Sequence, residues 1–221
     1  MDYSFLQCGE GALTVHLGDG IDPAINRRVT ALQGAIGSAG LRGITDLIPA
    51  YADLTVCYDC TVISAKALQR QLRRLLDSLS VAGQDRRRVF QLPVCYGGDY
   101  GPDLDFVCHH SGLSAQEVIA LHSAPDYLIY MLGFLPGFAY LGGLDPRLHT
   151  PRLDSPRTCI PAGSVGIGGA QTGVYPLASP GGWQLLGRTP VSVFDRQRQE
   201  PILYRAGDLV HFVPISPAEY E

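Results

Sequence analysis

The chain has 221 residues, 46% of them hydrophobic and 17% charged, a balance typical of a globular protein with a sizeable core. Its formal net charge of −4 argues against general nucleic-acid binding, which needs a basic footprint. Nowhere do about 18 apolar residues follow one another, so no membrane-spanning helix is expected. We therefore expect a soluble, cytoplasmic protein that binds neither nucleic acid nor a membrane.

Lysine and cysteine usage narrows the possible chemistry. Lys66 is the sole lysine, and it does not lie in the sequence context of a Walker loop, a biotin carrier or a Schiff-base enzyme. The six cysteines are scattered through a chain too long to need disulfide bonds, so buried thiols are expected. Cys57 and Cys60 have C-x-x-C spacing, but they end a strand-like run and no second Cys or His pair lies nearby. We predict no metal site.

The first part of the chain alternates between the hydrophobic periods of strands and helices. Asp22 and Pro23 are typical of a helix start, and Ser64 is a second candidate cap. The expected order is strand, helix, strand, strand, helix, strand, over residues 12–17, 23–36, 44–50, 52–58, 65–79 and 89–95. This order is that of a ferredoxin-like α+β unit with both helices on one face of an antiparallel sheet.

The boundary of this unit is expected in a glycine-containing, charged linker at residues 83–88, which predicts an N-terminal domain at 1–86 and a second domain at 87–221. A local group of basic side chains precedes it. We interpret this group as a solvated helix face and a basic linker, with docking of a partner or of RNA as alternatives: Lys66, Arg70, Arg73, Arg74 and 86–88.

The sequence pattern in the second part of the chain predicts many short strands and little helix. Ser114 and Glu117 form a capping box ahead of a short helix that ends near His122. Strands are expected at 127–134, 164–167, 183–186, 191–195, 202–204 and 209–213. Such a pattern favours a barrel or a sandwich.

The segment between Gly133 and Pro190 holds 12 of the 26 glycines and 8 of the 16 prolines, so its loops have defined backbone conformations. Functional residues often lie on such loops. Arg152, Arg157 and Arg188 lie there beside prolines or proline-anchored turns. The planar guanidinium fork suits a carboxylate or a phosphate, so a small anion is the natural partner. Each arginine could instead cap loop carbonyls.

The glycine-rich run from Gly163 to Gly169 lacks the following helix and the G-K-[ST] sequence of a phosphate loop. Its N–H groups could still form an anion nest for a phosphate or a developing oxyanion. Ser164 has no G-x-S-x-G frame, so a hydrolase nucleophile elbow is not supported.

Neutral polar and aromatic side chains accompany these loops and suggest a pocket for a small polar ring. The donors and acceptors are Gln171, Thr172, Tyr175 and Ser179. The flat apolar walls, for which a place in the barrel core is the alternative, are Phe134, Phe138, Tyr140 and Trp183.

A series of motifs runs through this region in order and at close spacing: G-F-x-P-G-F-x-Y-L, T-P-R, P-R-T, P-A-G-S-V-G-I, Q-T-G-x-Y-P and S-P-G-G-W-x-L-x-G-R-T-P. With these motifs the chain resembles the family of 5-oxoprolinase (pyroglutamate hydrolase) B subunits, also called allophanate hydrolase subunit 1, which includes the kinase inhibitor KipI. The similarity extends over nearly the whole chain. It implies an N-terminal α+β domain and a C-terminal cyclophilin-like β-barrel.

The resemblance also implies a function. In this family the B subunit works with the C and A subunits to open the pyroglutamate lactam to glutamate at the expense of ATP, with Mg²⁺ at the level of the complex. A KipI-like regulator that binds a histidine kinase and catalyses nothing is the alternative.

Roles for individual residues follow from that implied reaction. Activation of a lactam carbonyl develops negative charge, so Arg157, Arg188 and the run beginning at Gly163 and Ser164 are the candidate catalytic groups. Arg152 is expected to hold the ring carboxylate. The ring is expected to be oriented and enclosed by Tyr140, Gln171, Thr172, Tyr175, Ser179 and Trp183.

Overall fold

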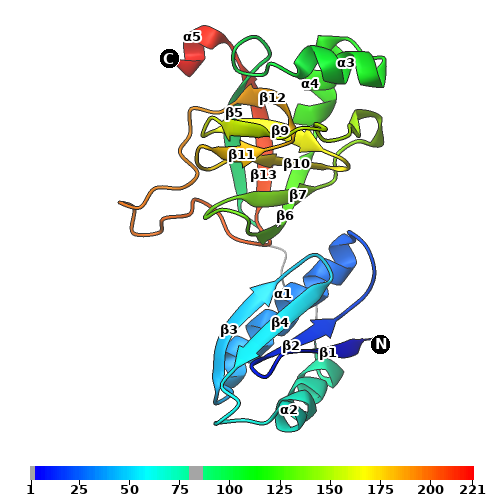
Figure 1. The fold of residues 1–221 in the computed structure, drawn as a ribbon, viewed down its shortest axis with the longest axis vertical. Coiled ribbons are helices and arrows are strands. Elements are labelled where there is room, and N and C mark those ends of the chain that lie inside the picture. Colours follow the sequence, from blue (N-terminus) through cyan, green and yellow to red (C-terminus); the bar gives the residue numbers. More distant parts are fainter. Residues whose placement is uncertain (1–2, 80–86) are drawn as a thin grey trace. The chain divides into compact units, whose positions relative to one another are not determined.

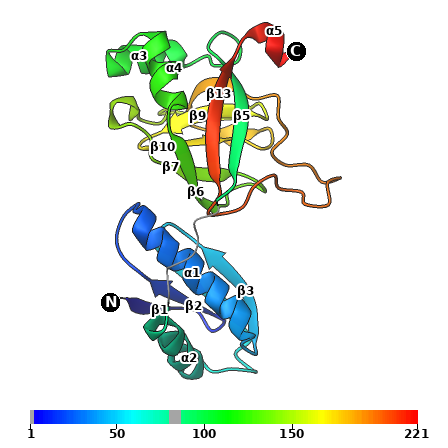
Figure 2. The same ribbon diagram turned by 180° about the vertical axis from the view of Figure 1, so that it is seen from behind.

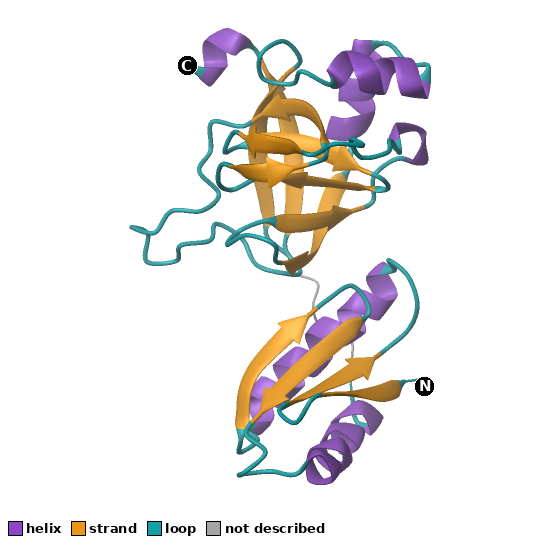
Figure 3. Ribbon diagram, in the orientation of Figure 1, coloured by secondary structure: helices purple, strands orange, loops and turns teal. Residues whose placement is uncertain are grey.

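This computed structural model describes residues 3–79 and 87–221, which belong to two compact units, 1–86 and 87–221 (Figure 1). Residues 83–86 of the predicted linker lie outside the described residues. Both units combine helices and strands, and the second contains a closed barrel, so the α+β class is confirmed (Figure 3). In the part of the chain that is described, no helix has both the length and the hydropathy needed to cross a membrane.

The first unit is a four-stranded antiparallel sheet with two helices. The sheet order is β1-β2-β4-β3. In chain order the elements are β1 (Ser4–Cys8), β2 (Ala12–His16), α1 (Pro23–Ala39), β3 (Ile44–Pro49), β4 (Asp53–Tyr58) and α2 (Ala65–Asp77).

Local signals in the sequence set the helix ends of this unit. The Asp22 carboxylate accepts a hydrogen bond from the Ala24 N–H at 2.6 Å, with Pro23 in the first turn of α1. Gly40 ends that helix in the left-handed conformation, at φ +56°. The Ser64 hydroxyl caps α2 through the Ala67 N–H.

Both helices contribute to one buried cluster with the two central strands of the sheet. Their apolar stripes meet the alternate residues of the two central strands, because side chains two apart on a strand share a face. The buried cluster consists of Leu13, Val15, Leu17, Val29, Leu32, Ile36, Leu54, Val56, Tyr58, Leu68, Leu72 and Leu76.

The predicted place of the last strand is wrong. Residues 89–95 do form a strand, β5 (Val89–Tyr96), but it pairs with β12 (Gln184–Arg188) and β13 (Leu209–Ile215) in the second unit. The edge beside β2 is instead occupied by β1, which was not predicted from the sequence. Hydrophobic alternation indicates that a segment is extended, but it does not say which strand is its partner.

The second unit is a closed barrel with the order β10-β7-β6-β13-β5-β12-β9 (Figures 1 and 2). Only β5 and β13 pair in parallel among these described strands. Besides β5, the strands are β6 (Asp126–Leu132), β7 (Ala139–Gly142), β9 (Ser164–Gly168), β10 (Gln171–Val174), β12 (Gln184–Arg188) and β13 (Leu209–Ile215).

Smaller elements surround the barrel. β8 (Arg157–Ile160) and β11 (Ser179–Gly181) form a separate two-stranded sheet. The helices are α3 (Leu104–Ser111), α4 (Ala115–Ser123), the 3₁₀ turn η1 (Pro146–Leu148) and α5 (Pro217–Tyr220). The predicted capping box of Ser114 and Glu117 is present at α4. Of the two architectures that the sequence favoured, the barrel is observed, because pairing of β9 with β10 closes the sheet on itself.

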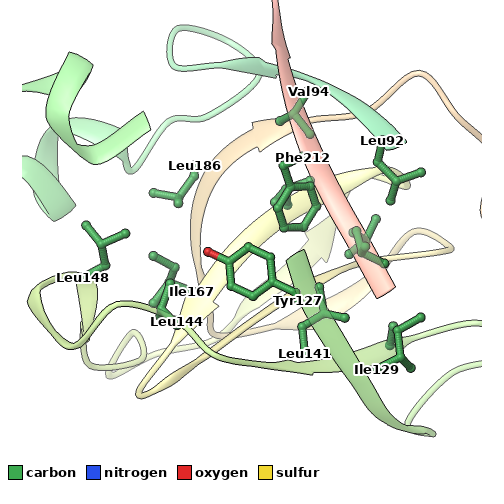
Figure 4. Close-up of a cluster of buried hydrophobic side chains, with 14 of the residues drawn as sticks. Leu92, Val94, Tyr127, Ile129, Leu141, Leu144, Leu148, Ile167, Leu186 and Phe212 are labelled. Carbon is green, nitrogen blue, oxygen red and sulfur yellow. The ribbon is translucent and has the colours of Figure 1, made fainter. Parts of the chain in front are cut away.

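Two of the predicted strands, 191–195 and 202–204, are not regular strands. They meet at a single isolated bridge between Phe194 and Ile202, at the base of a polar loop. Elsewhere the barrel interior is filled by large apolar side chains, with Tyr127 and Phe212 facing one another in a tilted contact of 5.5 Å (Figure 4). This interior is a packed core.

Candidate functional site

A cavity of about 310 Å³ opens beside the barrel in the second unit. Its walls come from the loop between β6 and β7 together with β7 itself, from the segment before β8, and from the segment between β10 and β12, which includes β11. Aromatic and small residues dominate the lining, which comprises Phe134, Phe138, Tyr140, Arg152, Pro156, Tyr175, Pro180, Gly181, Gly182 and Trp183. The volume lies at the lower end of the roughly 300–1,000 Å³ common for small-molecule sites.

Phe138 is the centre of the aromatic wall. Its buried ring makes edge-to-face contacts with Phe134 at 5.5 Å, Tyr140 at 5.0 Å, Tyr175 at 5.3 Å and Trp183 at 5.5 Å. Such contacts hold each ring in a defined orientation and give the cavity a rigid apolar wall. The four aromatic residues predicted as flat walls therefore all line one cavity.

Arg152 is the charged group of the cavity. Its guanidinium lies over the Trp183 ring, with Cζ 5.8 Å from the ring centroid. Within the described residues it forms neither a hydrogen bond nor an ion pair, and it is exposed. Burial raises the pKa of the neighbouring Tyr175 hydroxyl, which therefore stays protonated at neutral pH. The donor fork of Arg152 is thus available to an anion.

The other two predicted arginines are engaged by the protein and do not line the cavity. Arg157 forms an ion pair with Asp103, with Nη2 2.6 Å from Oδ1, and its Nη1 donates to the Trp183 carbonyl at 3.4 Å. Arg188 donates from Nε to the Ala162 carbonyl at 2.8 Å. Arg188 thus caps a loop carbonyl, the alternative considered from the sequence.

The anion nest expected from Gly163 to Gly169 does not form. Ser164–Gly168 is β9, which pairs with β10 on one edge and β12 on the other, so its backbone groups belong to two ladders. The flanking Gly163 and Gly169 donate to the carbonyls of Tyr175 and Thr150. Gly163 and Ser164 were expected to donate N–H groups to an oxyanion. In this conformation both N–H groups already donate to backbone carbonyls.

Close packing gives a different reason for glycine in this run. A Cβ at Gly168 would overlap the indole of Trp183, and a Cβ at Gly163 would overlap the Thr189 carbonyl. Gly163 also has a φ of +81°, which side chains rarely adopt. Gly168 therefore makes room for the Trp183 ring of the cavity wall, and Gly163 allows a close approach of the Thr189 backbone.

Thr172 lies in the barrel interior, in a buried polar chain. Its hydroxyl donates to the Gly166 carbonyl at 3.0 Å, so His122 Nε2–H donates to Thr172 Oγ1 at 2.8 Å. The His122 Nδ1 atom then accepts from the Tyr96 hydroxyl at 2.8 Å. Burial lowers the pKa of His122 to about 3, so this ring is neutral. These contacts indicate a structural role for Thr172.

Gln171 and Ser179 are also absent from the cavity lining. Gln171 is half-buried at the start of β10, and Ser179 is buried in β11 opposite Ile160. No three His, Cys, Asp or Glu residues converge as metal ligands within 3–79 and 87–221. Of the predicted site, the structure brings together Tyr140, Arg152, Tyr175 and Trp183.

Comparisons with known proteins identify the family. Residues 3–204 match the family model of the carboxyltransferase domain, subdomain C and D. The 5-oxoprolinase B subunit of Bacillus subtilis is 42% identical, over 99% of this chain and 95% of that protein, and the Escherichia coli O157:H7 protein of the same name is 45% identical over 93% of each. The chain belongs to the family of 5-oxoprolinase B subunits.

A solved structure agrees with this membership. TTHA0988 superimposes with a TM-score of 0.82 at 41% identity over 93% of this chain. The chain spans 40% of the length of TTHA0988. This member of the 5-oxoprolinase B subunit family thus shares its fold with a solved protein of similar sequence, and the cavity lies within that fold.

Sequence reasoning missed Asp103, which binds Arg157, and the lining residues Pro156, Pro180, Gly181 and Gly182. The S-P-G-G-W motif was a usable signal for the last three, because it leads directly to Trp183. Asp103 lies 54 positions before Arg157, and neither residue alone points to the other.

Proposed function

We propose that this chain is one subunit of an ATP-dependent 5-oxoprolinase complex that opens 5-oxo-L-proline to L-glutamate. The observation that carries the proposal is the Arg152 guanidinium over Trp183, which no described residue pairs with, in a chain that is 42–46% identical to proteins named as 5-oxoprolinase B subunits. A flat five-membered lactam with one carboxylate combines the two chemistries that this cavity offers.

In this proposal Arg152 binds the ring carboxylate through its fork of N–H donors. The ring lies against Phe138 and Trp183, whose edge-to-face packing leaves little room for movement. The Tyr140 and Tyr175 hydroxyls are the neutral groups that line the cavity and can bond the lactam N–H and carbonyl. Orientation by several fixed groups lowers the entropic cost of reaching the transition state.

When bound by the complex, ATP would supply the phosphoryl group that turns the lactam oxygen into a leaving group, and Mg²⁺ would neutralise charge on its phosphates. Of the described cavity-lining residues, none is a carboxylate, so the lining is poorly suited to Mg²⁺, which prefers oxygen ligands. We therefore propose that ATP and Mg²⁺ are held by the C and A subunits. In this division of labour the chain binds and orients the ring, and its scaffold is a closed barrel of the cyclophilin-like type together with a first unit of four strands and two helices.

The test is ATP-dependent release of glutamate from 5-oxo-L-proline by the complex that co-purifies with the tagged chain. Arg152→Ala should raise the KM about tenfold or more, because a charge-assisted contact is lost. Arg147→Ala is the matched control, since Arg147 is exposed and pairs with Asp145 away from the cavity.

Equal KM values for the two variants would contradict the role of Arg152. If no glutamate forms and a histidine kinase is the sole co-purifying partner, the enzymatic proposal is wrong and a KipI-like regulatory function replaces it.

A further inference from the structure

Phe134 has an unusual backbone at the rim of the cavity. The Leu135 N–H donates to the Gly133 carbonyl at 2.6 Å, which makes Phe134 the central residue of a three-residue γ-turn. Its φ is +62°, and among the described residues no other residue except glycine has a positive φ. This form of γ-turn is rare and strained for a residue with a bulky side chain.

The loop around Phe134 is held at both ends. Gly133 N–H donates to the Phe138 carbonyl at 3.1 Å, and Phe138 N–H donates to the Leu135 carbonyl at 3.0 Å. The buried Tyr204 hydroxyl donates to the Gly137 carbonyl at 2.9 Å. A strained residue persists where surrounding contacts over-determine its conformation, and these bonds do so.

Fold stability does not explain a phenylalanine at this position. The backbone favours glycine or asparagine there, and the residue is 62% exposed, so its burial contributes little to folding. The ring nevertheless lines the cavity and stands edge-on to Phe138 at 5.5 Å, with an interplanar angle of 85°. Its position is explained by the cavity.

We propose that Phe134 is a specificity-determining residue that covers the outer side of a flat ring ligand in this cavity. The γ-turn fixes the backbone that carries the ring, and the edge-to-face contact with Phe138 orients the ring at the cavity before a ligand arrives, so less freedom is lost on binding. For the ligand identity this inference rests on the proposed function, in which the ring is 5-oxo-L-proline. The covering role is independent of that identity.

Trp183 is the sole tryptophan of the chain and lines the same cavity, so its fluorescence reports on the cavity directly. The experiment titrates 5-oxo-L-proline into the full chain and its variants, and measures acrylamide quenching without ligand. Phe134→Ala removes the ring, Phe134→Tyr keeps it, and Phe106→Ala removes another exposed phenylalanine, on α3, that does not line the cavity. Phe134→Gly removes the ring and the backbone strain together.

Phe134→Ala and Phe134→Gly should each weaken binding about three- to tenfold, as expected for loss of one aromatic contact, and should increase quenching of Trp183. Phe134→Tyr and Phe106→Ala should match the parent chain. Unchanged affinity in the folded alanine and glycine variants would overturn the inference.

If the parent chain shows no saturable binding of 5-oxo-L-proline, the proposed ligand is wrong for this chain. The covering role of Phe134 is then tested only by acrylamide quenching of Trp183 in the absence of ligand. Greater quenching in both ring-deleted variants supports the covering role, and equal quenching overturns it.

Discussion

Asp103 and Arg157 form an ion pair that fixes the backbone behind the cavity. One Asp103 oxygen accepts from Arg157 Nη2 at 2.6 Å, and the other accepts from the Leu185 N–H at 2.6 Å. Arg157 also reaches the Trp183 carbonyl. Both partners are largely shielded, with side-chain exposures of 12% for Asp103 and 30% for Arg157. The pair therefore sets the position of the chain that carries the Trp183 ring.

Loss of this pair should reduce both stability and ligand binding. Arg157→Ala leaves the Asp103 carboxylate without its charged partner, and we expect the free energy of unfolding to fall by about 2 kcal/mol. Urea denaturation measures this change, and Arg147→Ala, which removes an exposed pair, should change it little. Arg157→Lys should recover only part of the loss, because lysine cannot contact Asp103 and Trp183 with one planar group.

A positioning role for Arg157 predicts a specific kinetic pattern. In the assembled complex, Arg157→Ala should raise the KM for the ring substrate while the Trp183 emission of the free chain shifts. A kcat loss with unchanged KM and unchanged emission would instead indicate direct participation in the chemistry.

Gly168→Ala should damage the cavity. The added methyl would overlap the Trp183 indole, so the ring must move, and we expect a cost of about 1–3 kcal/mol in stability together with weaker ligand binding. Gly34→Ala is the matched control, because a Cβ there meets open space on α1 and helix propensity favours alanine by about 0.5–1 kcal/mol. Thermal unfolding of the two variants should shift in opposite directions.

The buried His122 should make stability depend on pH in the acid range. In the folded chain its pKa is lowered to about 3 by burial, whereas the unfolded chain takes up the proton near the ordinary value of 6.5. Its contribution is therefore complete above pH 6.5 and is lost progressively as the pH falls toward 3, at about 1.4 kcal/mol per pH unit. The free energy of unfolding at pH 7, 6, 5 and 4 measures this slope.

His122→Gln isolates the contribution of this residue from those of the carboxylates. The variant should be less stable at pH 7, because the contacts to Tyr96 and Thr172 change, but its loss of stability between pH 6 and 4 should be shallower. Parallel slopes for the two proteins would show that His122 does not cause the acid sensitivity.

The cavity should distinguish the lactam from its product. Glutamate carries an ammonium and a second carboxylate, and within the described lining only Arg152 is charged. Binding glutamate would remove these groups from water without partners, which is costly. Trp183 fluorescence should therefore give at least tenfold weaker binding for L-glutamate than for 5-oxo-L-proline, about 1.4 kcal/mol. Equal affinities would contradict the proposed role of the aromatic wall.

Some features of this protein were determined by the sequence alone because their causes are local. The caps at Asp22 and Ser64 and the capping box of Ser114 and Glu117 involve side chains within three residues of the backbone groups they bind. The period of the apolar residues likewise identified both helices of the first unit. The aromatic character of the site was also readable, because the cavity walls lie within a few consecutive motifs.

Other features were decided by tertiary structure because they depend on which distant segments meet. Alternating apolar residues made 89–95 a strand, but pairing with β13 placed it in the barrel. The glycine-rich run could have exposed its N–H groups to an anion. Instead it forms β9, whose backbone groups pair with β10 on one edge and with β12 on the other. Asp103 engages Arg157 across 54 positions, whereas Arg152 lies over Trp183 and has no hydrogen-bond or ion-pair partner among residues 3–79 and 87–221. Three arginines in similar sequence contexts thus differ in role, because only folding determines which carboxylate or carbonyl lies within hydrogen-bonding distance of each.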